Sequence, residues 1–253
     1  MQQTETGSRS YLISIVMVAV LGGLLFGYDT AVISGAEKGL QAFFMGAKDF
    51  TYTDGMHGFT SASALIGCII GSAISGFLAT SLGRKKSLII AGLLFFISAL
   101  GSMEPEFLFF NHGEPTYSLL IMFNIYRVIG GIGVGLASAI CPMYIGEVAP
   151  SNIRGMLVSW NQFAIIFGQL VVYFVNFFIL GEHTNPVIEQ IGQGVNAVAP
   201  GSDPWTISTG WRYMFGSEAV PAGLFALLIC FVPETPRYLV TIGQDQKALG
   251  ILS

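Results

Sequence analysis

The chain has 253 residues, of which 53% are hydrophobic and 10% are charged, and its formal net charge is −4. Soluble domains average about 25% charged residues, so this composition excludes an ordinary soluble protein and indicates a polytopic membrane protein. The sequence has no basic block of the kind that binds nucleic acid. Its three cysteines lie in apolar segments without metal-ligand spacing, so we expect no metal site and no cofactor.

In chain order, apolar segments alternate with short polar connections, and a membrane helix needs about 20 apolar residues. Helices are expected because an open strand would leave backbone groups unpaired in lipid. The predicted transmembrane helices cover about residues 11–38, 58–80, 87–103, 117–142, 155–180 and 212–232. The fold class is therefore all-α, with a six-helix bundle over residues 1–235. Residues 236–253 are expected to begin a cytoplasmic linker helix that is cut short by the end of the chain.

The connection at 181–210 is rich in Gly, Pro, Asn and Gln and is long for a structureless loop. We expect it to be a mobile outer lobe, with at most a short helix. Basic residues set the orientation of the bundle in the membrane. One side carries Arg9, Arg84, Lys85, Lys86, Arg154, Arg237 and Lys247, and the other carries only Lys38 and Lys48 together with most of the acids. Both ends of the chain are therefore expected in the cytoplasm, with the bundle in the plasma membrane.

The first segment contains one acid, Asp29, within the run LGGLLFGYDTAVISG. A carboxylate at that depth costs several kcal/mol by most estimates and usually marks an ion or proton path. Arg127 is a second buried charge, in the fourth segment. At 1.5 Å per residue, it lies ~15 Å below Tyr117, and Asp29 lies ~16 Å below Leu40 on the same side.

The matching depths of Asp29 and Arg127 make an ion pair geometrically feasible. Pairing reduces the cost of burying both charges and makes the proton affinity of the acid depend on the distance to the arginine. Protonation of Asp29 would then release Arg127, as a proton-coupled transporter requires. A static structural ion pair is the alternative interpretation.

The fifth segment carries Gln162, Gln169 and Asn176, each seven residues apart and hence on one helical face. Amides donate and accept hydrogen bonds, which suits the hydroxyls of a neutral polyol. Phe26, one turn before Asp29, could add an apolar surface. Hydrogen bonding between helices explains the amides equally well.

Charged residues also gather where the segments end on the predicted cytoplasmic side. They are Arg84, Glu147, Arg154, Glu234 and Arg237. Such acids and bases could form ion pairs that close an inner gate, or they could only set the topology. The sequence contains no P-loop, H-E-x-x-H or serine-hydrolase elbow, so we expect a protein that is not an enzyme.

The motifs in this order resemble the sugar porter family of the major facilitator superfamily. They are GGLLFGYDTAVISG (22–35), SALIGCIIG (63–71), YRVIGGIGVGLAS (126–138), PMYIGEVAP (142–150), NQFAIIFGQL (161–170), GWRYMF (210–215) and PETPR (233–237). The resemblance implies a twelve-helix fold of two six-helix halves, each a three-plus-three inverted repeat, of which this chain is the N-terminal half. It implies a C-terminal six-helix half as the partner. The family favours Asp and Arg, or Asn and Arg, where Thr80 and Ser81 stand.

The resemblance also implies roles for individual residues. Asp29 would be the protonatable acid and Arg127 its partner, and Phe26, Gln162 and Gln169 would contact the sugar. The charged residues Arg84, Glu147, Arg154, Glu234 and Arg237 match the family's cytoplasmic network. The predicted function is proton-coupled sugar symport in a bacterial inner membrane, with a pentose such as D-xylose as the first candidate. A passive sugar facilitator, a non-transporting sugar receptor or a truncated remnant are the alternatives.

Overall fold

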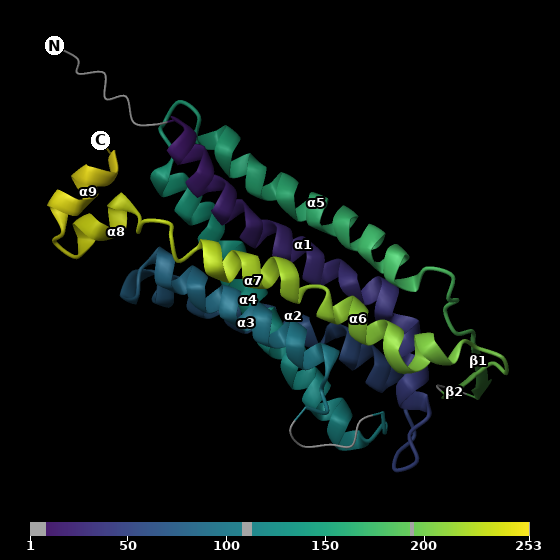
Figure 1. Ribbon diagram of the computed structural model, residues 1–253. Coiled ribbons are helices and arrows are strands. Elements are labelled where there is room, and N and C mark those ends of the chain that lie inside the picture. Colours follow the sequence, from purple (N-terminus) through teal and green to yellow (C-terminus); the bar gives the residue numbers. More distant parts are fainter. Residues whose placement is uncertain (1–8, 108–112, 193–194, 253) are drawn as a thin grey trace.

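The computed structural model describes residues 9–107, 113–192 and 195–252. Within these ranges, five helices are long and apolar enough to cross a membrane. They are α1 (Arg9–Met45), α2 (Asp54–Ser81), α3 (Arg84–Met103), α4 (Tyr117–Val148) and α5 (Arg154–Leu180). The helices run side by side along one long axis (Figure 1). Short connections join them, so consecutive helices run in opposite directions.

The expected sixth span at 212–232 is not one continuous helix. It consists of a π-helix, η1 (Thr206–Gly210), followed by α6 (Trp211–Gly216) and α7 (Ala219–Leu228). The interruption at Ser217 and Glu218 has a local cause in Pro221. A proline has no N–H to donate to the carbonyl four residues earlier, and its ring crowds that carbonyl, which here belongs to Ser217.

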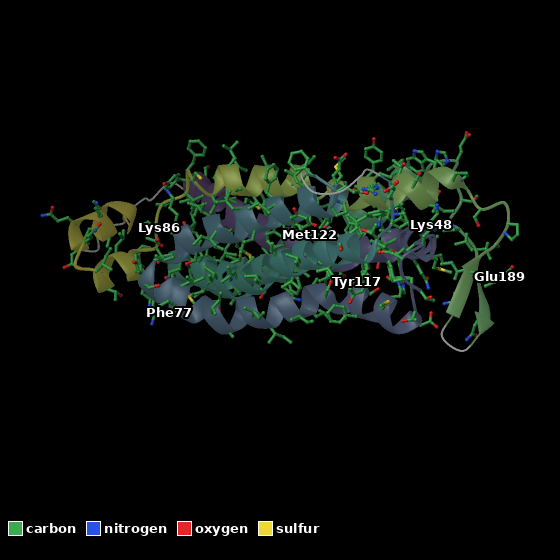
Figure 2. All side chains as sticks on the ribbon, turned by 90° about the horizontal axis from the view of Figure 1, so that it is seen from below. Lys48, Phe77, Lys86, Tyr117, Met122 and Glu189 are labelled. Atoms are coloured by element: carbon green, nitrogen blue, oxygen red, sulfur yellow. The ribbon has the colours of Figure 1, made fainter. Side chains whose placement is uncertain are left out.

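The two ends of the bundle carry different structures. At one end lie α8 (Pro236–Thr241) and α9 (Asp245–Leu252), and we call this the helical end. At the opposite end, which we call the hairpin end, β1 (Ile188–Gly192) pairs antiparallel with β2 (Val195–Val198). The sequence prediction for the 181–210 connection missed this hairpin. Figure 2 shows Lys86 toward the helical end and Glu189 at the hairpin end.

Helix contacts follow a repeated pattern. The α2 helix packs most extensively on α4, and α1 packs most extensively on α5. The α3 helix also lies against α4, and α6 and α7 lie against α1 and α3. If α1, α2 and α3 correspond to α4, α5 and α6, the α1–α5 contact corresponds to the α4–α2 contact. These are the two most extensive contacts between helices. The bundle is therefore a three-plus-three inverted repeat, as the sequence predicts.

Glycines bring these helix pairs into close contact. A Cβ at Gly67 of α2 would overlap the carbonyl oxygen of Val128 in α4, and one at Gly131 of α4 would overlap that of Ala64. The α1–α5 pair repeats the arrangement, since a Cβ at Gly27 would overlap the carbonyl of Ile165. Small residues at such positions let helix backbones approach closely in lipid, where packing replaces the hydrophobic drive.

This packing predicts that Gly67→Ala destabilises the bundle by about 1–3 kcal/mol, because the added methyl group overpacks a backbone contact. Gly76→Ala, on the same helix, is the matched control, since a Cβ at Gly76 meets no atom within 4 Å. Thermal unfolding of the detergent-solubilised protein measures both. Equal melting temperatures for the two variants would show that the α2–α4 contact is looser than described.

Candidate functional site

A partly open cavity lies where α1, α2 and α4 meet. Its volume is about 160 Å³. It is lined by Phe26, Asp29, Thr30, Ile33, Ser61, Ala64, Leu65, Cys68, Arg127 and Val134. The structure therefore brings three of the residues proposed from the sequence, Phe26, Asp29 and Arg127, to one cavity.

The two buried charges form a direct ion pair. Arg127 donates from Nη1 to Asp29 Oδ1 at 2.5 Å, and the two side chains are only 2% and 3% exposed. The guanidinium also lies over the Phe215 ring, 5.1 Å from its centroid. Arg127 Nε is buried without a hydrogen-bond partner among the described residues. Removing either charge would leave the other uncompensated in a low-dielectric interior, which is costly.

A third charged residue, Glu218, joins this pair and was missed by the sequence analysis. It lies at the break between α6 and α7 and is 2% exposed. Glu218 interacts electrostatically with both Asp29 and Arg127. The signal was present, because Glu218 is the lone charge in the apolar run from 213 to 233. The reasoning that singled out Asp29 applies to it equally.

The amides of α5 are not all placed alike. Asn176 is buried and donates to the backbone carbonyl of Val32 in α1 at 3.3 Å, so it serves helix packing. Gln162 is exposed and Gln169 is half-buried, and neither is among the residues that line the Asp29 cavity. Seven residues fall about 20° short of two full turns, so side chains spaced by seven residues shift gradually around the helix axis.

Residues 15–253 match the family described as "Sugar (and other) transporter". The chain belongs to this family. Among curated relatives, the D-xylose-proton symporter of Escherichia coli is 49% identical over 97% of this chain and 48% of its own length. The arabinose-proton symporter of Bacillus subtilis is 37% identical over 99% of this chain and 46% of its own length.

Solved structures of the family agree with the fold. The partially occluded, inward-open xylose transporter XylE from E. coli superposes with a TM-score of 0.84 at 49% identity, covering 96% of this chain and 55% of that one. XylE bound to 6-bromo-6-deoxy-D-glucose gives a TM-score of 0.84 at 48% identity, covering 97% of this chain and 50% of that one. The chain thus has the major facilitator fold and spans about half the length of the curated relatives it matches.

At the helical end, the charged residues of this family member form a network between helices. Arg84 of α3 donates to Glu147 of α4 at 2.7 Å, and Arg237 approaches the same carboxylate oxygen at 4.0 Å. Glu234 accepts from the backbone N–H groups of Arg84 and Lys85 at the start of α3. A carboxylate at a helix N-terminus interacts favourably with the helix dipole.

Arg154 has a different partner from the other members of this network. In the described part of the chain it donates to the backbone carbonyl of Ala149, at 3.3 and 3.4 Å, and forms no ion pair. It therefore caps the end of α4. The structure brings Arg84, Glu147, Glu234 and Arg237 together, with α8 joined to α3 and α4.

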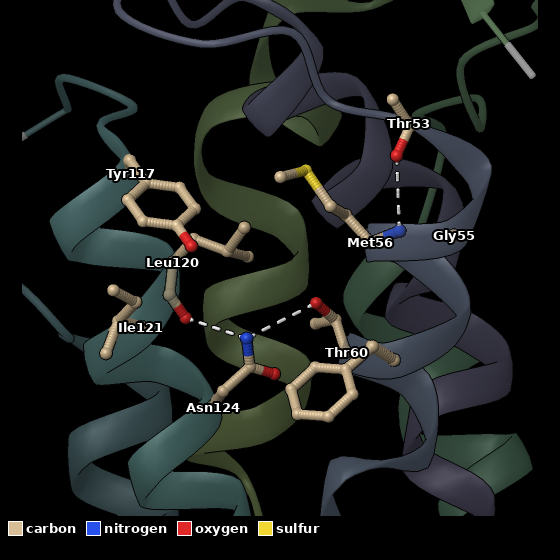
Figure 3. A pocket seen from close by; sticks show the side chains of 9 residues that line it. Thr53, Gly55, Met56, Thr60, Tyr117, Leu120, Ile121 and Asn124 are labelled. Carbon is tan, nitrogen blue, oxygen red and sulfur yellow. Dashed lines mark hydrogen bonds between the residues drawn. The ribbon is translucent and has the colours of Figure 1, made fainter.

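A hollow of about 390 Å³ lies between the hairpin-end parts of α2 and α4 (Figure 3). Its polar centre is Asn124, whose amide nitrogen donates to the Leu120 carbonyl at 2.9 Å and to Thr60 Oγ1 at 3.4 Å. No charged residue is among those that line it. The proposed site residues all lie elsewhere.

A second buried ion pair at the hairpin end was not predicted. Arg212 donates from Nη1 to Glu106 Oε2 at 2.6 Å and from Nη2 to Glu106 Oε1. The guanidinium also stacks over Trp211 and Phe43. Burial by itself would raise the pKa of Glu106, but the hydrogen bonds and charge of Arg212 outweigh it and lower that pKa below its ordinary value.

The lowered pKa of Glu106 predicts an acid-sensitive contribution to stability. A carboxyl with a lower pKa in the folded state stabilises the protein above its ordinary pKa of about 4.3, and this is lost as pH falls through the folded value. Glu106→Gln should reduce stability near neutral pH by about 1–3 kcal/mol and flatten the acid side of the pH profile. Thermal melting across pH, with exposed Glu182→Gln as the control, tests this. An unchanged acid slope in Glu106→Gln would contradict it.

Proposed function

We propose that this chain is the N-terminal half of a proton-coupled sugar symporter. The observation that carries the proposal is the buried Asp29–Arg127 ion pair on the wall of the cavity between α1, α2 and α4. Charges at this depth are expensive in a membrane and mark ion or proton paths. Relatives named as xylose and arabinose proton symporters support this function. D-xylose is the first candidate substrate because that relative shares 49% identity with the chain.

The proton acts by changing which acid neutralises Arg127. With Asp29 ionised, the guanidinium is held on α1. Protonation of Asp29 removes this anion, and Glu218 offers Arg127 another one close by. One proton shared by the two carboxyls leaves the three groups neutral in total, which favours burial in a low dielectric. Proton binding thereby changes the contact between α1 and α4.

Sugar binds at the cavity that this ion pair borders. Phe26 presents an apolar ring there, and Gln162 and Gln169 of α5, which lie outside the lining of this cavity, supply hydrogen bonds to sugar hydroxyls that extend beyond it. The site is completed by a second six-helix half, against which this bundle rocks in alternating access. The helical end, which carries Arg84, Lys85 and Lys86, faces the cytoplasm of a bacterial cell. The network of Arg84, Glu147, Glu234, Arg237 and the nearby Arg154 closes the inner gate.

Asp29→Asn tests the proton role. The neutral amide keeps the shape of the carboxyl but cannot exchange a proton, so sugar-driven proton uptake should fall to background while sugar counterflow persists. Both are measured in proteoliposomes that contain the protein expressed from its complete gene. Glu189→Gln, an exposed acid on β1, should leave both unchanged. If Asp29→Asn still concentrates sugar against its gradient, the assignment is wrong.

A passive sugar facilitator is the second candidate. The glucose facilitated diffusion protein of Zymomonas mobilis is 31% identical over 99% of this chain and 49% of its own length. A facilitator needs no titrating acid, so the unsubstituted protein would then carry sugar without any change of external pH. Symport instead makes the external solution more alkaline during sugar uptake.

A further inference from the structure

The Asp29 cavity is not the only opening near the buried acids. A hollow of about 400 Å³ lies at the hairpin end, where α3 and α5 end beside α6. It is lined by Met103, Ile179, Trp205, Tyr213, Gly216 and Ser217. None of these described residues lines the Asp29 cavity. One of them, Ser217, directly precedes Glu218 in the chain.

Ser217 connects this hollow to α1. Its hydroxyl lies 2.7 Å from the phenol oxygen of Tyr28, whose side chain is buried. Ser217 donates its own proton to the carbonyl of Met214 at 2.6 Å, so Tyr28 donates to Ser217. Tyr28 precedes Asp29 and is rotated from it by about 100° around α1. Asp29 lines the cavity, whereas Tyr28 contacts Ser217, a lining residue of the hollow.

Glu218 is the group that would accept a proton arriving through the hollow. It is 2% exposed, and its Oε1 has no hydrogen-bond partner among the described residues. A buried carboxylate oxygen without a partner is costly, so a proton or a donor stabilises it. Glu218 directly follows Ser217 in the chain, and it interacts electrostatically with both Tyr28 and Asp29. The helix break at Pro221 frees this stretch from regular helix geometry.

The outer rim of the hollow carries groups that exchange protons. The indole of Trp205 stacks between the rings of His183, at 4.2 Å, and Tyr213, at 6.4 Å. His183 Nδ1 lies 2.6 Å from Asp203 Oδ2. Arg212, on the same stretch of helix as Tyr213, is already bound to Glu106. A titratable histidine–aspartate pair thus borders the opening at the hairpin end.

We propose that protons reach Glu218 from the outer solution through this hollow and the Ser217–Tyr28 hydroxyl pair, by a route separate from the sugar cavity. The inference rests on the proposed function and on its outward placement of the hairpin end. Ser217 and Tyr28 are the relaying residues, and Glu218 passes the proton on to Asp29.

Each transfer conserves protons. A hydronium ion in the hollow gives a proton to Ser217 Oγ, Ser217 gives its own proton to Tyr28 Oη, and the phenol gives its proton to Glu218. Every relay oxygen gains one O–H bond and loses one, the hydronium becomes water, and only the carboxylate gains a proton. Rotation of the Ser217 hydroxyl away from Met214, and of the phenol O–H toward Glu218, sets the direction.

Tyr28→Phe and Ser217→Ala test the relay in the protein expressed from its complete gene. Each should lower the initial rate of sugar-driven proton uptake by about a hundredfold, with a changed solvent deuterium isotope effect and with sugar counterflow intact. Tyr213→Phe, which lines the hollow outside the hydroxyl pair, should keep the normal rate. Unchanged rates in both relay variants, or a sugar-independent proton leak, would overturn the proposal. A leak would show that the pair seals the hollow.

A labelling experiment separates this inference from the proposed function, because it does not depend on transport. In a background with the three native cysteines changed to serine, Ser217→Cys should react with a membrane-impermeant thiol reagent added outside. Saturating D-xylose should not slow that reaction, whereas restored Cys68, which lines the Asp29 cavity, should be protected. Ala222→Cys, at a fully buried position of α7, is the unreactive control. Protection of Ser217→Cys by sugar, or no reaction, would contradict a separate route.

Discussion

The structure depends on placing a carboxylate and a guanidinium together inside a bundle that lipid surrounds. Neither charge is tolerable alone at this depth, and the pair is stable only when α1 and α4 hold the two groups in direct contact. Arg127 therefore has three restraints, the Asp29 carboxylate, the Phe215 ring and the nearby Glu218. The apolar core is divided at this level into two clusters, one toward each end of the bundle.

Glycine packing supplies the precision that such an ion pair needs. The α2–α4 and α1–α5 pairs are locked by backbone contacts that a single methyl group would disturb, as at Gly67 and Gly27. The α1–α4 contact that carries the charges is less extensive than either pair. The ion pair thus lies at the contact between two tightly packed helix pairs.

The two ends of the bundle use charge in different ways. At the helical end, Arg84 and Glu147 link α3 to α4, and Glu234 binds the first amides of α3 just before α8 begins. These contacts cross between elements, and the Arg84 and Glu147 side chains are largely buried. At the hairpin end, Glu106 and Arg212 are buried as a bidentate pair beneath aromatic rings. The first network links α3 and α4 to the segment that leads into α8, whereas the second fixes the start of α6 to the end of α3.

The sequence by itself determined the membrane class, the five long helices, the family resemblance and the equal depths of Asp29 and Arg127. The membrane class, the helices and the depths follow from composition, apolar run length and rise per residue, which are local properties, and the resemblance follows from the motifs and their order. Only the tertiary structure decided that Glu218 joins the pair, that Asn176 packs on α1 while Gln162 is exposed, and that Arg84 rather than Arg154 meets Glu147. Each of these depends on how helices rotate against one another and on where Pro221 interrupts the last one, and no spacing along the chain encodes such rotations.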